Sequence, residues 1–444
     1  MSRGLGDVYK RQVYDPAARE ENQATVTLSQ GKKYITAVTT LCYDGCTKRG
    51  ISRVLWDPSV DAYAAERLRQ RAVKLSFFKA ARQVTGVTPS WGALTGIRPA
   101  KLAAGYLEQG MTPRQVDRLL RDTYCVSQTR RELCIEAAQA GLKAKSELHP
   151  EDISLYIGIP FCPTRCAYCS FVSQAVEKSF GLMEPYLEVL LGEITRAAQM
   201  VEDLGLHIKS FYMGGGTPGI LTPDQMDAIL TALEESFDLS ACPEITVEIG
   251  RPDTITAEKL AVLKSHGVTR VCVNPQTMED HVLAAIGRRH VSADTVRAME
   301  LVRAYRFPHV NMDLIAGLPE DTPEGFRRSL DKCLELGADD ITIHTLALKK
   351  GSRILMEGLS IPDGAAVQAM LDYAAPTLRA AGFVPYYLYR QKYMSGSFEN
   401  IGWCISGAEG LYNIYIMEEL HSILSLGAGG STKICLLYTS DAAD

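Results

Sequence analysis

The spacing of apolar and polar residues changes near residue 150, which predicts two regions of different architecture. Residues 24–40 alternate in character around Gln30-Gly31, and this pattern indicates a β-hairpin. From about residue 61 to residue 147, apolar residues recur at helical spacing in four segments. We therefore expect a small α+β domain over residues 13–150.

Beyond this boundary, short apolar runs typical of strands alternate with helical segments six times. The runs begin near Ser154, Lys209, Ile245, Thr269, His309 and Asp340. Short connections between strand and helix predict a parallel sheet with helices outside it. Six units are fewer than the eight of a closed barrel. We therefore predict an α/β fold, an incompletely closed (β/α)6 barrel over residues 151–350, with its chemistry at the carboxyl ends of the strands.

Both ends of the chain look foreign to this fold. The stretches MSRGLGDVYKRQ and CLLYTSDAAD fit neither a cap nor an element and are similar to translated sequencing-adaptor sequence. We exclude residues 1–12 and 435–444 from fold reasoning and expect the natural protein to be longer at both ends. Residues 351–434 are then a truncated carboxyl-terminal extension.

Composition and charge favour a cytoplasmic enzyme. The net charge of −5 gives no global basic field, so we expect no nucleic-acid partner. No apolar run approaches the roughly 20 residues that a membrane span needs, and the amino end lacks the apolar core of a signal peptide. Nine of the twelve cysteines are scattered, which is not typical of a disulfide framework and favours a reducing compartment.

The other three cysteines, Cys162, Cys166 and Cys169, lie within eight residues. Their C-x3-C-x2-C spacing offers three thiolates, whereas a [4Fe–4S] cluster is normally held by four. One iron would then be open to a ligand that is not protein. Zinc is the alternative, but structural zinc usually takes two cysteine pairs or cysteines with histidines. The nearest histidines, His149 and His207, lie outside this loop.

Polar or glycine residues also stand at the ends of the predicted strands that follow. They are the run Gly214 to Pro218, Glu248, Gln276, Arg288 and Asp313. Each alone fits a tight turn, a salt bridge or a cap as readily as a ligand contact. Several such groups at successive strand ends beside a metal loop favour a binding site.

The chemistry of these groups suggests the ligand. An open iron favours chelation by an amino and carboxylate pair, the guanidinium of Arg288 suits a carboxylate, and acids such as Glu248 and Asp313 suit ribose hydroxyls. S-adenosylmethionine (SAM) has all of these parts and is a radical source when paired with iron–sulfur chemistry. Transfer of an electron to its sulfonium would give methionine and a 5′-deoxyadenosyl radical.

From about Ser154 to Lys433 the sequence resembles the radical SAM superfamily and, within it, the oxygen-independent coproporphyrinogen III oxidase (dehydrogenase) family. The motifs are LYIGIPFCPTRCAYCSF, YMGGGTPG, the spaced Glu248, VNPQTM through Arg288, and NMDLIAGLP. The resemblance implies that Cys162, Cys166 and Cys169 ligate a [4Fe–4S] cluster. It also implies SAM contacts at Tyr156, Tyr168, Gly215, Gly216, Thr217, Glu248, Gln276, Arg288, Asp313 and Ala347. The segment WGALTGIRPAKLA resembles the HemZ-type subgroup.

The reaction that the resemblance implies is oxidative decarboxylation of two propionates of coproporphyrinogen III to vinyl groups, giving protoporphyrinogen IX. The radical would take a hydrogen from the propionate β-carbon, and a donor such as flavodoxin or ferredoxin would reduce the cluster. A substrate with four carboxylates needs cationic partners. The candidates are Lys349, Lys350, Arg353, Arg390 and Lys392, with solvated surface side chains as the alternative. Tyrosines 386, 387, 389 and 393 are either a surface for the macrocycle or ordinary strand aromatics.

One departure from the family pattern keeps other functions open. Cys169 is followed by Ser170 and Phe171, where the best-known catalytic branch continues to a fourth cysteine. A phenylalanine there also occurs in relatives that resemble haem carriers. The alternatives are therefore a haem-binding chaperone of the same family, or another radical SAM enzyme such as a C-methyltransferase.

Overall fold

A computed structural model describes residues 22–169, 174–176, 180–349, 352–391 and 394–435. The chain groups into two compact units, one built from residues up to 95 with 118–130, the other from 96–117 with 131–443. The segments expected to be foreign, residues 1–12 and 435–444, lie outside the described residues except for Cys435. The domain boundary expected near residue 150 stays a prediction.

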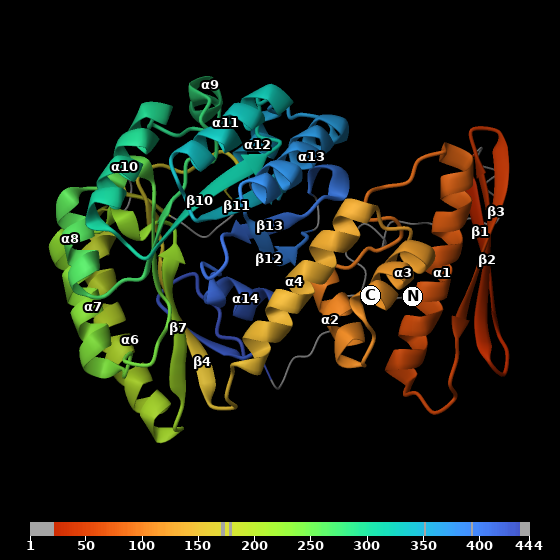
Figure 1. Cartoon of the computed structure of the whole chain (residues 1–444), viewed down its shortest axis with the longest axis horizontal. Helices are drawn as coiled ribbons and strands as arrows, with labels where there is room; N and C mark the ends of the chain where they lie inside the picture. Colours follow the sequence, from red (N-terminus) through yellow and green to blue (C-terminus); the bar gives the residue numbers. More distant parts are fainter. Residues whose placement is uncertain (1–21, 170–173, 177–179, 350–351, 392–393, 436–444) are drawn as a thin grey trace. The chain divides into compact units, whose positions relative to one another are not determined.

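The first unit contains a three-stranded antiparallel sheet, β1 (Gln23–Gln30), β2 (Tyr34–Tyr43) and β3 (Cys46–Leu55), with α1 (Ala62–Thr85) on one face (Figure 1). The predicted hairpin is β1 and β2, which is confirmed. The sequence analysis missed β3. Its turn, Asp44-Gly45, has φ of 48° and 71°, the two positive values of a type I′ hairpin, and the Asp-Gly pair is its sequence signal.

Small inward side chains on β3 let α1 pack closely on this sheet. A side-chain carbon added to Gly50 would lie 2.0 Å from the carbonyl oxygen of Ser76, so only glycine fits there. The hydroxyls of Thr39 and Ser76 lie 2.7 Å apart and join β2 to the helix. Because the inward positions of β3 include Gly50 and Ser52 instead of large apolar residues, β3 lacks the usual alternation of a half-buried strand.

The second unit contains a nine-stranded sheet with the order β12-β13-β11-β10-β9-β8-β7-β4-β14. Six of its strands are parallel neighbours in chain order, which confirms the predicted incomplete (β/α)6 barrel. They are β4 (Asp152–Ile159), β7 (His207–Gly215), β8 (Ile245–Gly250), β9 (Arg270–Val273), β10 (His309–Ala316) and β11 (Asp340–Thr345). Each begins within two residues of its predicted start.

The carboxyl-terminal region extends this sheet at both edges. β14 (Ser422–Leu426) runs parallel to β4, whereas β13 (Asn400–Cys404) pairs antiparallel with β11 and with β12 (Val384–Tyr389). Beside the cysteine loop, two short parallel strands of two residues each, β5 (Phe161–Cys162) and β6 (Gln174–Ala175), pair with one another. The barrel strands are therefore covered on both sides and have no free edge of their own.

Helices lie outside the barrel strands (Figure 1). They are α6 (Met183–Asp203), α7 (Pro223–Ser236), α8 (Ala257–Ser265), α9 (Asp280–Ala285), α10 (Ser292–Tyr305), α11 (Pro323–Glu335), α12 (Arg353–Glu357) and α13 (Gly364–Ala380). α14 (Leu411–Glu418) instead contributes Asn413 and Met417 to the barrel interior. The helical segments predicted before the barrel are α1, α2 (Pro99–Glu108), α3 (Pro113–Tyr124) and α4 (Gln128–Ser146). The start of α7 is fixed by its capping residues: Thr222 and Gln225 form a capping box, and Pro223 occupies the first helical position.

A buried ion pair occupies the barrel interior at the amino-terminal ends of the strands. Arg270, the first residue of β9, donates to Asp340, the first residue of β11, across 2.7 Å. The hydroxyl of Tyr386 donates to the same carboxylate at 3.0 Å. Burial raises the pKa of Asp340 to about 7 although Arg270 opposes the rise. This network fixes the end of the barrel that lies away from the cysteine loop.

Within the described ranges, none of the helices combines the length and apolar character that crossing a bilayer requires.

Candidate functional site

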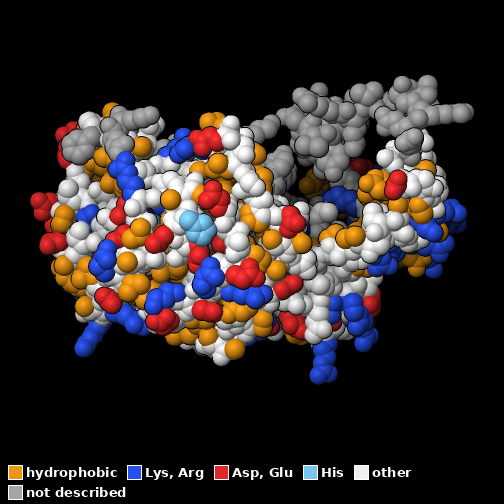
Figure 2. Space-filling view, turned by 90° about the horizontal axis from the view of Figure 1, so that it is seen from above, with side chains coloured by type: hydrophobic (Ala, Val, Ile, Leu, Met, Phe, Trp, Pro, Cys, Tyr) orange, Lys and Arg blue, Asp and Glu red, His pale blue; other side chains and the backbone are white. Residues whose placement is uncertain are grey.

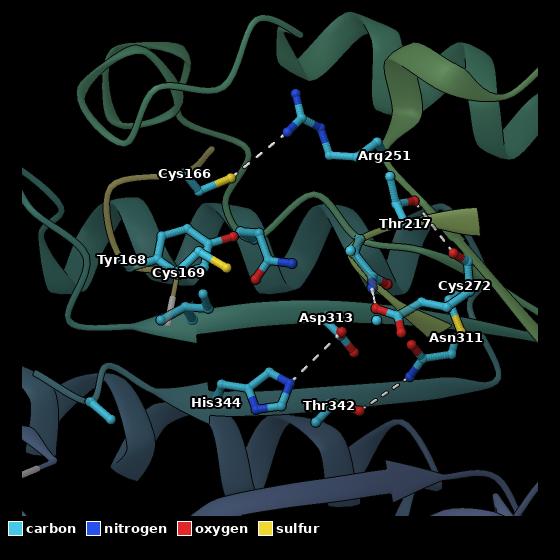
Figure 3. Close-up of a pocket in the computed structure, with 18 of the residues that line it drawn as sticks. Cys166, Tyr168, Cys169, Thr217, Arg251, Cys272, Asn311, Asp313, Thr342 and His344 are labelled. Atoms are coloured by element: carbon cyan, nitrogen blue, oxygen red, sulfur yellow. Dashed lines mark hydrogen bonds and ion pairs between the residues drawn. The ribbon is translucent and has the colours of Figure 1, made fainter. Parts of the chain in front are cut away.

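A cavity of about 340 Å³ occupies the barrel interior of the second unit (Figure 3). Cys162, Cys166 and Cys169 line it at the carboxyl ends of the strands, and Arg270 and Asp340 line it at the amino ends. Parallel barrels hold their chemistry at the carboxyl ends of the strands. The three cysteines of the C-x3-C-x2-C spacing therefore border one interior space at the chemically used end.

Hydrogen bonds to neighbouring elements hold the cysteine loop in place. The amide of Ala167 donates to the carbonyl of Ile286 at 2.9 Å, just after α9. Arg251 reaches the loop from the end of β8, with Nη1 3.8 Å from Cys166 Sγ and 3.3 Å from Thr164 Oγ1 (Figure 3). Arg251 thereby links the end of β8 to both the Cys166 sulfur and the Thr164 hydroxyl of the loop.

No group of three or more His, Cys, Asp or Glu side chains in the described part of the chain is gathered as a site for a single metal ion. The ligands of a [4Fe–4S] cluster bind different irons, so they need not meet at one point as the ligands of a single ion do. The three cysteines share one cavity, which is the arrangement that a cluster requires.

Two of the predicted site glycines are required by the packing of the cysteine loop. A side-chain carbon on Gly216 would lie 2.4 Å from the carbonyl oxygen of Phe161, and one on Gly215 would lie 3.0 Å from the backbone of Ile159. Gly215 also has a φ of 108°, which other residues rarely adopt. The glycines therefore bring the end of β7 against the loop, and both line the cavity.

We expect Gly216→Ala to destabilise the protein by about 1–3 kcal/mol, because its methyl group would push Phe161 and the cysteine loop aside. The matched control is Gly192→Ala on the exposed side of α6, where nothing lies within 4 Å of an added carbon. That change is expected to stabilise by about 0.5–1 kcal/mol, since helical glycine costs backbone entropy. Urea unfolding of both variants measures this, and equal effects would contradict the packing argument.

Glu248 on β8 is a carboxyl group held among polar partners inside the cavity. It accepts from the Tyr212 hydroxyl at 3.2 Å and from Asn274 Nδ2 at 3.3 Å. Burial raises the pKa of Glu248 to about 8, and nearby Asp313 adds to the rise, while the Tyr212 hydrogen bond and Arg288 oppose it. The group therefore titrates near neutral pH, as expected for an acid that awaits a partner.

Arg288 ties the cysteine loop to the end of β9. Its Nη1 donates to the carbonyl of Asn274 at 2.7 Å, and its Nη2 donates to the hydroxyl of Tyr168 at 3.1 Å. Burial raises the pKa of Tyr168 although Arg288 opposes the rise, so the hydroxyl stays neutral. A residue of the cysteine loop is thereby fixed relative to the sheet.

Gln276 and Asp313 join two neighbouring strand ends. The backbone amide of Gln276 donates to the backbone carbonyl of Asp313 at 2.9 Å. Gln276 also has a φ of 71°, which is unusual for a residue that is not glycine. His344 Nε2 lies 3.8 Å from the Asp313 carboxylate (Figure 3). Backbone conformations of this kind cluster at functional sites.

The residues present fit an amino-acid-bearing nucleotide ligand beside a cluster. Asn274 Oδ1 and Arg288 Nε are buried and lack a hydrogen-bond partner among the described residues. Both residues line the cavity. A buried acceptor or donor without a hydrogen-bond partner costs desolvation free energy unless a ligand forms a hydrogen bond with it. Three thiols at one end of the cavity supply the donor chemistry that iron requires.

Of the predicted site residues, all except Tyr156 line this one cavity: Tyr168, Gly215, Gly216, Thr217, Glu248, Gln276, Arg288, Asp313, Ala347 and the three cysteines. Tyr156 instead stacks with Tyr212 and Tyr412, at ring-centroid distances of 6.2 and 6.0 Å. Phe171, on which the haem-carrier alternative rested, lies outside the described residues.

The candidate partners for substrate carboxylates are placed unevenly. Lys349 lines the cavity. Arg353 pairs with Glu357 along α12 at 2.7 Å, and Arg390 donates to the carbonyl of Ser397 at 2.8 Å. Lys350 and Lys392 lie outside the described residues, as does Tyr393. Tyr387 and Tyr389 line the cavity, with their rings stacked 6.3 Å apart.

Sequence reasoning missed several residues of the cavity wall, and a signal for them was present. They are Tyr212, Arg251, Arg270, Cys272, Asn311, Asp340 and Thr342. Asn311 and Asp313 on β10 are two residues apart, as are Asp340, Thr342 and His344 on β11. Strand residues two apart share a face, so this spacing identifies the interior side of each strand.

The comparisons with known proteins agree with this fold. Residues 156–333 match the Radical SAM superfamily. Over 354 residues the chain is 39% identical to the oxygen-independent coproporphyrinogen-III oxidase-like protein HemZ of Bacillus subtilis (strain 168). The aligned region covers 79% of this chain and 71% of HemZ. The heme chaperone HemW of Mycobacterium tuberculosis (strain CDC 1551 / Oshkosh) is 28% identical over 269 residues, 60% of this chain and 65% of HemW.

Among solved structures, coproporphyrinogen III oxidase (HemN) from Escherichia coli has a TM-score of 0.54 at 23% identity, over 67% of this chain and 68% of HemN. Fold and site thus define a radical SAM protein, a class that uses a [4Fe–4S] cluster and SAM. Within that class, the chain belongs to the family of oxygen-independent coproporphyrinogen-III oxidase-like proteins.

Proposed function

We propose that this protein is a radical SAM oxidoreductase that decarboxylates two propionates of coproporphyrinogen III to vinyl groups, giving protoporphyrinogen IX. The observation that carries the proposal is the cavity itself. The cysteine loop, the polar strand ends and a pair of stacked tyrosines, Tyr387 and Tyr389, border one interior space. The identity to a relative named for this reaction supports the same substrate class.

In this proposal Cys162, Cys166 and Cys169 hold the cluster. The polar groups around Glu248 and Arg288 hold SAM. When bound, the cluster and SAM together supply a 5′-deoxyadenosyl radical. The chain's own contribution is to bind and orient: Arg288 fixes Tyr168 of the cysteine loop. The barrel wall around the cavity would limit the access of water to the reacting carbon.

The raised pKa of Glu248 predicts a pH dependence of SAM binding. Below pH 8 the carboxyl is largely protonated and accepts ribose hydroxyls poorly, so SAM affinity is expected to rise by about 15-fold from pH 6.5 to 8, by about a further twofold to pH 9, and then to level off. Glu248→Gln, which mimics the protonated acid, is expected to bind weakly and without this slope. Equilibrium dialysis with reconstituted protein of verified iron content measures both. A slope retained in Glu248→Gln assigns the titration to another group.

The side of the cavity formed by β10, β11 and β12 is the proposed substrate side. Asn311, Thr342 and His344 project into it, and Lys349 borders it. Hydrogen-bonding groups and a cation near stacked aromatic rings suit a macrocycle that carries carboxylates.

The test is anaerobic incubation of reconstituted protein with coproporphyrinogen III, SAM and dithionite, followed by porphyrin mass spectrometry. The expected product has lost CO2 and two hydrogens from each of two side chains. An unchanged porphyrin mass while SAM is still cleaved would exclude this substrate and leave the cofactor chemistry in place.

A haem-binding chaperone is the second candidate, because two of the described candidate cations, Arg353 and Arg390, are engaged by Glu357 and by the Ser397 carbonyl. A site with fewer cations for a tetracarboxylate suits haem, which has two propionates. HemW proteins among the relatives support this candidate. Tight stoichiometric haem binding by the same preparation, without vinyl products, would establish it in place of the oxidoreductase.

A further inference from the structure

We propose that the open face of the β1–β3 sheet in the first unit binds single-stranded nucleic acid. The chain's net charge of −5 conceals an uneven distribution between the two units. Residues 22–95 and 118–130 carry 14 of the 47 lysines and arginines but only 5 of the 52 acidic residues. This unit is therefore strongly basic while the rest of the chain is acidic, and such asymmetry is typical of polyanion binding.

The three strands themselves contain no acidic residue. Their sequences are QATVTLSQ, YITAVTTLCY and CTKRGISRVL. α1 covers the face that carries the buried residues Ile35, Ala37 and Val54. Residues alternate between the two faces of a strand, so the positions between these buried ones form the opposite face.

The ladder registers identify the open face, which no element of the first unit covers among the described residues. Tyr34 pairs with Leu55, Thr36 with Arg53, and Thr40 with Arg49. Thr25 pairs with Thr40 and Thr27 with Val38. Arg49, Arg53, Thr25 and Thr27 are exposed, and Tyr34 is 47% exposed. The face therefore combines two arginines, several hydroxyls and an aromatic ring with the exposed apolar side chains of Ile51 and Leu55.

These groups match the chemistry of a sugar–phosphate backbone. Arginine forks and threonine hydroxyls are common contacts to phosphate and sugar. A tyrosine offers a ring on which a base can stack. Neither Arg49 nor Arg53 forms an ion pair with another described residue. Figure 2 shows blue Lys and Arg side chains projecting from the surface of the molecule.

The flatness and width of the sheet favour a single strand over a duplex. The major groove of duplex DNA, about 12 Å wide, admits a helix or a two-stranded ribbon. Three strands spaced about 4.8 Å apart, with side chains, are too wide for it. An open sheet instead presents a flat platform along which single-stranded RNA or DNA can lie.

The test uses the full chain and fluorescence anisotropy with a labelled RNA of about 20 nucleotides at about 50 and 200 mM salt. We expect binding that weakens steeply with salt. Arg49→Glu with Arg53→Glu should lower affinity at least about tenfold at the lower salt and reduce the salt slope by about 1.4, because two phosphate contacts are lost. Arg49→Lys with Arg53→Lys should bind within about threefold of the wild type, since the charges remain.

The matched control places the same charge change in the other unit, with Arg297→Glu and Lys332→Glu on α10 and α11. It should bind RNA like the wild type, and all three variants should retain the wild-type iron content. Absence of RNA and single-stranded DNA binding at the lower salt would overturn the proposal. So would equal weakening by the control, equal affinity for duplex DNA, or binding to phosphatidylserine vesicles that RNA does not compete away.

Discussion

Alanine at Cys162, Cys166 or Cys169 is expected to leave the protein folded but without most of its iron. All three thiols line one end of the barrel cavity. Removing any one of three would leave a cluster with two protein ligands, which is too few to retain it during desalting. The expected wild-type content after anaerobic reconstitution is about four iron and four sulfide per chain. SAM cleavage should fall to background in each variant.

Cys272→Ala is the sharp control for this prediction. Cys272 lines the same cavity from β9 and is the one further cysteine among the described lining residues. Burial raises the pKa of its thiol, which keeps the group protonated and a poor ligand. The variant should therefore keep its iron and its SAM cleavage. Iron loss in Cys272→Ala would make it a fourth ligand and close the position that SAM needs.

Arg270→Leu is expected to destabilise the protein by about 3–5 kcal/mol, because it leaves the buried Asp340 carboxylate without its cation. The melting temperature should fall by at least about 5 °C. The matched control is Arg328→Leu, which removes an exposed guanidinium from a pair with the half-buried Glu279 and should cost less than about 1 kcal/mol. Thermal unfolding followed by circular dichroism compares the two.

The pH dependence of this deficit has a definite sign. The folded pKa of Asp340 is already raised to about 7, so its ionisation lowers stability as pH rises toward that value. Without Arg270 the folded pKa rises further, and the variant continues to lose stability above pH 7 where the wild type no longer does. The deficit should therefore grow between pH 7 and pH 8.5. A deficit that shrinks over this range would mean that Asp340 is not the group left unpaired.

The barrel could be predicted from the sequence because its six strands are apolar runs with short connections to amphipathic helices. The strand β3 could not be found by apolar alternation, since Gly50 and Ser52 face a closely packed helix. The Asp44-Gly45 turn was the available signal. The charge asymmetry between the units was open to sequence reasoning, because residues 22–95 alone carry 11 lysines and arginines and only 4 acidic residues. The net charge of the whole chain conceals it.

The cavity was predictable in part, because the polar strand ends interrupt apolar runs and are conspicuous. Arg270, Asn311 and Thr342 were missed because they lie within short strand-like runs whose interior side the sequence does not show. The interior of an open barrel accepts polar residues at every second position, and only the strand register shows which positions those are. Hydrogen bonds between distant segments, such as Arg288 to Tyr168, have no sequence signal.

The most direct test of the proposed chemistry follows a hydrogen atom from substrate to cofactor. Coproporphyrinogen III deuterated at the propionate β-carbons is incubated anaerobically with reconstituted protein, SAM and dithionite, and the 5′-deoxyadenosine is analysed by mass spectrometry. The account predicts deuterium in the 5′-deoxyadenosine in proportion to the vinyl product formed. Deuterium-free 5′-deoxyadenosine beside an unaltered porphyrin would contradict it.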